Sequence, residues 1–183
     1  MSKQKWSGGL FLALMLLYNC QNQAPQKEGL TVAGPVQFVA DQAPFPKLSD
    51  YAFFTGIQRD LQPNEGVLPY ELITPLFTDY AHKSRFVWMP KGTQASVDAE
   101  GRLSFPDQTV LIKNFYYPAD FKQPDRDWDL METRLLMKNK GEWQAVTYVW
   151  DEAENDAELN IVGDIKPVSW QDEKGHKQNI EYI

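Results

Sequence analysis

The sequence predicts a mainly β protein, an antiparallel β-sandwich or barrel-like domain with little helix. Three observations lead to this prediction. Short runs of β-branched and aromatic residues recur about every ten residues, Gly and Pro bound these runs, and amphipathic helical periodicity is almost absent. Hydrophobic residues make up 43% of the chain and aromatic residues 13%, which favours a folded domain with a sizeable core over a disordered chain.

Residues 1–20 predict a lipoprotein-type signal peptide. Lys3 and Lys5 precede an apolar run, "GGLFLALMLLY", that is too short to cross a bilayer as a helix. The run is followed closely by Cys20, the only cysteine, which cannot form an internal disulfide and resembles the lipid-attachment cysteine of bacterial lipoproteins. An ordinary secretory leader is the alternative. We therefore expect an exported protein that is anchored to a membrane by a lipid on Cys20 and faces the periplasm or the cell surface.

Two further regions follow the leader. Residues 21–40, which begin with a tract rich in Gln, Pro and Ala, predict a flexible tether, and residues 41–183 predict one β domain. Near the start of this domain, "KLSDYAFFTG" predicts one short helix with Ser49 as its N-cap and Gly56 as its stop.

The strands of the domain are predicted by alternating apolar residues between turn residues. Single strands are expected at "RFVWMP" and "TVLIKNFYY", and hairpins at "SVDAEGRLSF", "TRLLMKNKGEWQAVTYVW" and "VSWQDEKGHKQNIEYI", with turns at residues 99–101, 139–141 and 174–175. Both faces of "TVLIKNFYY" are largely apolar, so this strand is predicted to be central and covered on two sides. We expect Trp143, Tyr148 and Trp150 to be buried between two sheets.

Charge is distributed unevenly along the chain. The formal net charge of −7 argues against nucleic acid as a partner, because phosphate binding needs a basic surface. The stretch "PLFTDYAHKSRFVWMPKGT" is nevertheless cationic and aromatic. The structural interpretation of this stretch buries Tyr80, Phe86 and Trp88 and leaves Lys83, Arg85 and Lys91 in solvent.

A functional interpretation treats His82, Lys83, Arg85 and Lys113 as a ligand-binding or partner-binding surface. Lys113 lies within an apolar strand, where a buried ammonium needs a carboxylate or acquires a lowered pKa. It could reach the edge of the sheet, pair with Glu132 or Asp79, or line a pocket for an anionic ligand. The same alternatives apply to Arg85 and Arg134, and the structural one is preferred for all three.

Catalytic and metal-binding motifs are not recognised. The two histidines, His82 and His176, lack ligand-type neighbours at short spacing, and the only cysteine belongs to the leader. The acidic run "DEAENDAELN" lacks the glycine and the spacing of a calcium-binding EF-hand loop, so it predicts a solvated turn or a short helix with acidic residues near its N-terminus. We predict no catalytic residue and no metal site.

Five phrases of the chain resemble, in order, an uncharacterised family of secreted bacterial proteins. They are "PYELITPLFTDYAHKSRFVWMPKGT", "LSFPDQTVLIKNFYYP", "METRLLM", "WQAVTYVWDEAENDAEL" and "VSW". Members of this family are described as c-type cytochromes and are often encoded beside a parallel β-helix repeat protein. Longer members carry a Cys-x-x-Cys-His motif for haem c, which this sequence lacks. The resemblance is therefore to the N-terminal β domain of such proteins, and no cofactor is expected in this chain.

The resemblance implies a non-enzymatic, membrane-tethered β domain that is accessory to a c-type cytochrome or another electron-transfer protein. One alternative is a periplasmic carbohydrate-binding module, which would present two or more coplanar exposed tryptophans. A second alternative is a fragment of a haem-dependent oxidoreductase, because "FPDQTVLIKNF" is similar to periplasmic cytochromes in which a strand lysine, here Lys113, is cross-linked to haem. The expected partners are a membrane and a redox protein.

Overall fold

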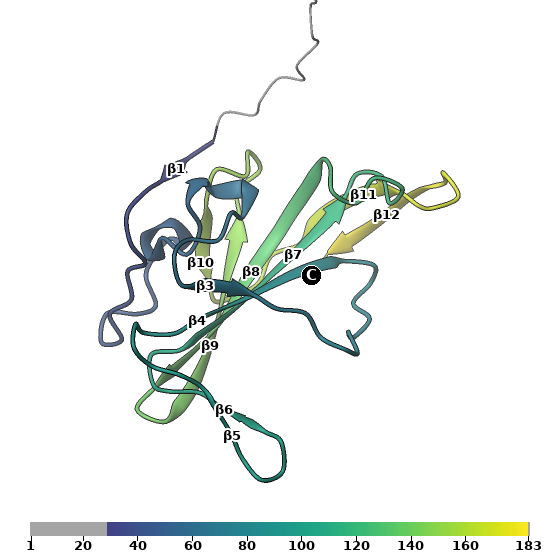
Figure 1. Ribbon diagram of the computed structural model, residues 1–183. Helices are drawn as coiled ribbons and strands as arrows, with labels where there is room; N and C mark the ends of the chain where they lie inside the picture. Colours follow the sequence, from purple (N-terminus) through teal and green to yellow (C-terminus); the bar gives the residue numbers. More distant parts are fainter. Residues whose placement is uncertain (1–28, 183) are drawn as a thin grey trace, which may run out of the picture.

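The computed structural model describes residues 29–182, and these residues form a mainly β domain (Figure 1). The elements are, in order, β1 (Thr31–Val32), η1 (Leu48–Tyr51), β2 (Gly56–Ile57), η2 (Gln58–Asp60), β3 (Val67–Pro69), β4 (His82–Trp88), β5 (Ser96–Val97), β6 (Leu103–Ser104), β7 (Val110–Pro118), β8 (Trp128–Asn139), β9 (Glu142–Trp150), β10 (Ala157–Asn160), β11 (Lys166–Gln171) and β12 (Lys177–Tyr182). The predicted fold class is confirmed. Residues 1–28, and with them Cys20, lie outside the described part of the chain. Between residues 29 and 182, no helix has the length and apolar character needed to cross a membrane.

A six-stranded antiparallel sheet forms the centre of the domain, in the order β10-β9-β8-β7-β4-β3. The pairs β1-β2, β5-β6 and β11-β12 form three small antiparallel sheets. All three predicted hairpins are present. The hairpin between β8 and β9 turns at Lys140 and Gly141, whose φ angles of 52° and 82° suit the two-residue turns that join twisted strands.

One face of the large sheet, called face 1, carries the main hydrophobic core. The segment of residues 29–65, on the left in Figure 1, covers this face with Leu48, Tyr51, Phe53 and Phe54. These side chains pack against residues of β7, β8 and β9, including Ile112, Leu135, Tyr148 and Trp150. Burying one such large apolar side chain contributes roughly 1.5–3 kcal/mol, so this layer stabilises the whole sheet. Face 1 is thus covered by irregular chain and 3₁₀ turns, with only the short β1-β2 sheet within that layer.

Residues 47–56 do not form the single helix that the sequence predicts. The 3₁₀-helix η1 has Lys47 at its N-cap, and it ends where Ala52 adopts the left-handed conformation with φ 50°. Ser49 instead donates its hydroxyl hydrogen to Asp156, at 2.6 Å. An irregular path lets the side chains of Tyr51, Phe53 and Phe54 all reach the core, whereas an α-helix would direct Tyr51 and Phe53 to different sides.

The expected tether also takes part in the fold over its described residues. β1 pairs with β2, and the backbone N–H of Gln37 donates to the carbonyl of Tyr51 at 2.8 Å. The ring of Phe38 lies 6.4 Å from that of Tyr51 in a stacked arrangement. Residues 31–38 therefore extend the layer that covers face 1.

The opposite face, called face 2, is covered over one half by the β11-β12 hairpin. Val168 and Trp170 of β11 pack there on Phe115 and Tyr117 of β7 and on Met131 of β8. β7 contributes Val110 and Ile112 to the core on face 1 and Phe115 and Tyr117 to the core on face 2. β7 is a central strand, as predicted, but it is covered on both sides only along its second half, because the hairpin does not extend over Leu111.

The predicted burial of the tryptophan-rich strand is correct at one end only. Tyr148 and Trp150 are buried in the core, as predicted. Trp143 is 38% exposed, so its predicted burial is wrong. It lies opposite Lys138 on face 2, next to the hairpin turn, where neither the layer of residues 29–65 nor the β11-β12 hairpin covers it.

Candidate functional site: a row of cations across the sheet

Three cationic side chains lie side by side on face 2. In the register of the sheet, Arg85 of β4 is opposite Lys113 of β7, which is opposite Arg134 of β8. Residues that are directly opposite in a sheet project from the same face, and adjacent strands are about 4.8 Å apart. Arg85, Lys113 and Arg134 are called the cation row below. Lys83 projects from the same face of β4, two residues before Arg85.

The cation row is packed closely against an aromatic ring. The Nζ of Lys113 lies 4.5 Å from the centroid of the Phe115 ring, and the guanidinium carbon of Arg134 lies 4.8 Å from the same centroid. Phe115 is buried between β7 and the β11-β12 hairpin. Both cations therefore interact with one ring, and cation–π attraction offsets part of the repulsion between them.

Repulsion among the cations is evident in the electrostatics of Lys113. Burial lowers the pKa of Lys113, and the neighbouring charges of Arg85, Arg134 and Lys83 lower it further. Among the described residues, Lys113 forms no ion pair, including with Glu132 or Asp79, the two partners considered from the sequence. Lys113 is thus a half-buried ammonium surrounded by like charges, which is an environment that an added anion would stabilise.

Two carboxylates offset only part of this positive charge. Glu132 pairs with Arg134 at 2.6 Å and accepts a hydrogen bond from the hydroxyl of Tyr182 at 2.7 Å. Glu71, an exposed residue, approaches Arg85 at 3.4 Å. Counting only Glu71 and Glu132, the carboxylates that pair with them, the four cations keep a local formal charge of +2 on a chain whose net charge is −7. Asp79, Asp164 and Glu181 also lie around Arg134 without pairing with the row.

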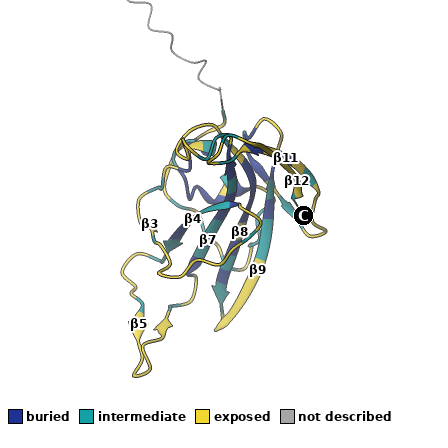
Figure 2. Ribbon diagram, turned by 90° about the vertical axis from the view of Figure 1, so that its right-hand side faces the viewer, coloured by how far each residue is buried: buried dark blue, intermediate teal, exposed yellow. Residues whose placement is uncertain are grey.

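The β3–β4 loop (residues 70–81) crosses the β4 side of this site. The loop is attached where Lys83 donates to the carbonyl of Leu76 at 3.0 Å and where the hydroxyl of Tyr117 donates to the carbonyl of Asp79 at 2.7 Å. Figure 2 looks onto face 2 and shows this loop in front of the sheet. The loop explains why Arg85 is only 5% exposed while Arg134 is half exposed.

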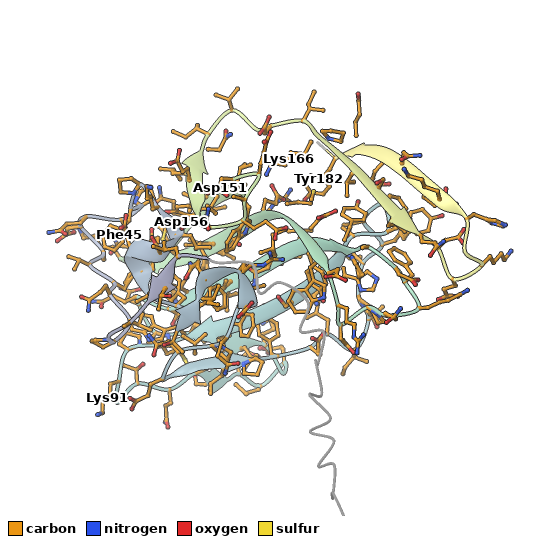
Figure 3. All side chains as sticks on the ribbon, turned by 90° about the horizontal axis from the view of Figure 1, so that it is seen from above. Phe45, Lys91, Asp151, Asp156, Lys166 and Tyr182 are labelled. Carbon is orange, nitrogen blue, oxygen red and sulfur yellow. The ribbon has the colours of Figure 1, made fainter. Side chains whose placement is uncertain are left out.

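Two details of the cationic stretch differ from the structural interpretation of the sequence. Arg85 was expected in solvent and is buried, because the β3–β4 loop covers it. Tyr80 was expected in the core and is 58% exposed, because it belongs to this loop and not to β4. Lys91 is exposed, as expected, and Figure 3 shows it projecting far from Tyr182.

His82 does not join the cation row. It precedes Lys83 on β4 and therefore points away from face 2. Its ring lies 5.8 Å from that of Tyr116 and 5.0 Å from that of Phe121. Burial, followed by the charge of Lys83, lowers the pKa of His82, which favours a neutral imidazole within an aromatic contact.

Three residues of the site were not selected from the sequence as functional. Arg134 was interpreted as structural, and Glu132 only as a possible partner of Lys113, while Tyr182 was not considered. Alternation along β8 places Glu132 and Arg134 on one face, so a pattern was available in the sequence. The pattern alone could not show that this face lies beside Lys113, because that depends on the pairing of β7 with β8.

The acidic residues after β9 hold a turn together. The carboxylate of Asp151 accepts hydrogen bonds from the backbone N–H groups of Asn155 and Asp156, at 3.0 and 3.3 Å. Asp156 in turn accepts from Ser49, and Lys166 donates to the carbonyl of Trp150.

Within residues 29–182, no three His, Cys, Asp or Glu side chains are grouped as metal ligands.

The tryptophans of the described residues do not form a platform for a sugar. Trp150 and Trp170 are buried, Trp88 and Trp128 are partly buried, and Trp143 is exposed. A pair of coplanar exposed tryptophans, which would favour carbohydrate binding, is therefore not present in the part of the chain that the structure describes.

Comparison of the chain with protein-family models, with curated proteins and with solved structures gives no match. The function must therefore be argued from the geometry of the cation row and from the expectations that the sequence raises.

Replacing Lys113 with Met should stabilise the protein. The substitution removes a like charge that lies directly opposite two others, and such pairs destabilise a sheet by about 0.2–1 kcal/mol. We expect urea denaturation at low ionic strength to show a gain of this size, and added salt to reduce the difference. The matched control is Lys91→Met, outside the row, which should change stability by less than about 0.5 kcal/mol. A loss of stability in Lys113→Met would contradict the description of the row as repulsive.

Proposed function

We propose that this protein is a non-enzymatic β domain that binds an acidic partner through the cation row. The domain is tethered to a membrane through Cys20, faces the periplasm or the cell surface, and is accessory to a c-type cytochrome or another electron-transfer protein. The observation that supports binding is the local charge of +2, built from three adjacent strands of an acidic chain.

The cation row suits a partner protein better than a reaction. Hydrogen-bonded strands hold Arg85 and Lys113 at fixed positions, and no group of three His, Cys, Asp or Glu side chains that could hold a metal is present among the described residues. A cationic patch on a protein of opposite net charge orients an approaching acidic surface and accelerates association. Lys113 is partly buried, which lowers the local dielectric, so a carboxylate that reaches its ammonium is attracted more strongly than at an open surface.

The nature of the partner is proposed from the resemblance of the chain to proteins described as c-type cytochromes. In such proteins a β domain accompanies a haem domain, and a separate or neighbouring haem protein would be the natural partner of this chain. The cation row supports docking of an acidic surface, and a cytochrome could carry such a surface.

Photo-crosslinking in the bacterial cell tests this proposal. A photoreactive p-benzoylphenylalanine at position 145, replacing the exposed Ala145 on face 2, leaves all four cations intact. We expect irradiation to give an adduct that stains for covalent haem after denaturing electrophoresis. The double substitution Lys83→Glu/Lys113→Glu should reduce the adduct at least tenfold.

The control has the same change in net charge at other positions. Each Lys→Glu substitution changes the charge by −2, so Lys91→Glu/Lys140→Glu also lowers the formal charge from −7 to −11. This variant should retain the adduct. An adduct without haem would refute the cytochrome partner, and an adduct insensitive to the charge reversal would refute docking through the cation row.

A further inference from the structure

A row of apolar side chains runs beside the cation row on face 2. Leu68 of β3, Val87 of β4, Leu111 of β7, Leu136 of β8 and Ala145 of β9 are successive partners in the register of the sheet. Leu68 is 55% exposed, Ala145 is exposed, and the other three are partly buried. These five residues are called the apolar row.

The two rows run parallel across the strands. Val87, Leu111 and Leu136 each lie two residues along their strands from a member of the cation row, which is a separation of about 7 Å. The apolar row crosses five strands, so its ends are about 19 Å apart. Beyond it, Lys138 and Trp143 form the next opposite pair, with the Lys138 ammonium 5.9 Å from the Trp143 ring.

No described helix or strand covers this half of face 2, and Phe105 packs on it only at the far end, with its ring 6.1 Å from that of Trp143. A sheet normally buries its apolar face against another layer, and the β11-β12 hairpin provides such a layer only over Phe115, Tyr117 and Met131. Figure 2 shows the other half turned toward the viewer, with intermediate and exposed residues along β8 and β9. The β3–β4 loop borders this half and exposes large apolar side chains, Leu72, Ile73, Leu76 and Phe77.

We propose that this half of face 2 receives an acidic amphipathic helix of the docking partner. The inference rests on the proposed docking function and adds the shape and chemistry of the element that docks. Carboxylates of the helix would lie over Lys113 and Arg134, because the β3–β4 loop already covers Arg85. Its apolar stripe would lie over the apolar row and contact the exposed side chains of the β3–β4 loop.

The spacing of the rows favours a helix over an extended segment. A strand lying across the sheet directs only one line of side chains at it, because alternate side chains point away. Such a line cannot cover two rows that are about 7 Å apart. A helix is about 10–12 Å wide and presents an apolar stripe beside a polar one, so it can reach both rows. A helix of about thirteen residues is about 19 Å long, which matches the length of the apolar row.

Peptide binding to the full chain tests this inference. The protein is placed in phosphatidylcholine nanodiscs, and binding of a fluorescent peptide is followed by anisotropy. The probe is a designed helix of about fourteen residues with leucines on one face and glutamates on the adjoining face. The control peptide has the same composition with its leucines distributed around the helix. We expect the striped peptide to bind at least tenfold more tightly than the control peptide.

Variants of exposed residues then locate the binding surface without risk to the core. Leu68→Ser/Ala145→Asp should weaken binding of the striped peptide at least tenfold. The matched control is Val97→Asp/Leu103→Ser on the β5-β6 hairpin, where both side chains are similarly exposed, and it should bind normally.

Equal affinity for the two peptides would overturn the inference, because charge alone would then account for binding. Absence of binding would also overturn it. If the protein attaches to phosphatidylglycerol vesicles and Leu68→Ser/Ala145→Asp abolishes this attachment, the surface binds lipid instead. If the protein self-associates and the same variant abolishes self-association, the surface binds a second copy of this chain. The peptide assay contains no haem protein, so it tests the surface independently of the cytochrome partner. If the striped peptide binds selectively but the crosslinked adduct in the cell carries no haem, the cytochrome partner is refuted and the helix-binding surface stands.

Discussion

Truncating Trp150 to Ala should cost roughly 3–5 kcal/mol of unfolding free energy. Trp150 is 1% exposed and belongs to the main core between β9 and the segment of residues 29–65. Its indole N–H donates to the hydroxyl of Thr133 at 3.0 Å, and that hydroxyl donates to the side chain of Asn114 at 2.6 Å. The substitution would leave a cavity and remove one bond from a buried polar network, and both effects act in the same direction.

Urea denaturation at neutral pH measures this loss. A domain of this size has a total stability of about 5–15 kcal/mol, so Trp150→Ala could unfold part of the population in buffer. Trp143→Ala is the matched control on the same strand, and because its side chain is partly exposed we expect a loss of about 1 kcal/mol or less. Similar losses for the two variants would contradict the description of face 1 as the main core.

Removing the carboxylate of Glu154 should be nearly as damaging. Glu154 pairs with Arg59 at 2.7 Å, where the side chains are 7% and 13% exposed, and its other oxygen accepts from the backbone N–H of Leu130 at 2.8 Å. Glu154→Ala leaves the guanidinium of Arg59 buried without its partner. Breaking a buried ion pair on one side costs about 3–5 kcal/mol.

Two companion variants separate the ion pair from the turn in which Glu154 lies. Glu152→Ala changes an exposed carboxylate in the same turn and should alter stability by less than about 0.5 kcal/mol. Replacing both partners, as Arg59→Met/Glu154→Leu, should recover much of the loss, because no unpaired charge then remains in the interior. A double variant as unstable as Glu154→Ala would show that the hydrogen bond to Leu130, not the ion pair, is the stabilising contact.

Local rules were sufficient to predict most of the strands. Alternation and turn residues identified the hairpins that contain Gly101, Gly141 and Gly175, because each of these glycines has a positive φ that other residues adopt at a cost. The two-sided character of β7 was also visible, since apolar residues occupy both of its faces.

Residues 29–65 were the least predictable part of the fold. Their path depends on where Tyr51, Phe53 and Phe54 find space against face 1, and no local periodicity describes such a path. The predictions that Tyr80 and Trp143 are buried were wrong for a related reason. Whether an aromatic residue at the end of a strand is buried depends on how far the covering layer extends.

The candidate site was predicted in part. Lys83, Arg85 and Lys113 were identified as a possible partner surface, and the structure brings these three together on face 2. His82 was included with them because it is adjacent in sequence, although adjacent residues of a strand project from opposite faces. Arg134 completes the row from a strand that begins ten residues after β7 ends, so only the pairing of these strands revealed its place.

The sequence by itself determined which side chains share a face within each strand, because alternation follows from the geometry of one extended chain. It also determined the chemistry available, because an acidic chain places Lys or Arg residues on β4, β7 and β8. Only the tertiary structure decided which strands are neighbours and in which register they pair, because these depend on competition among all possible pairings for one core. Arg85, Lys113 and Arg134 form a row only in the observed register, and a shift of β7 by one residue would turn Lys113 toward the core on face 1.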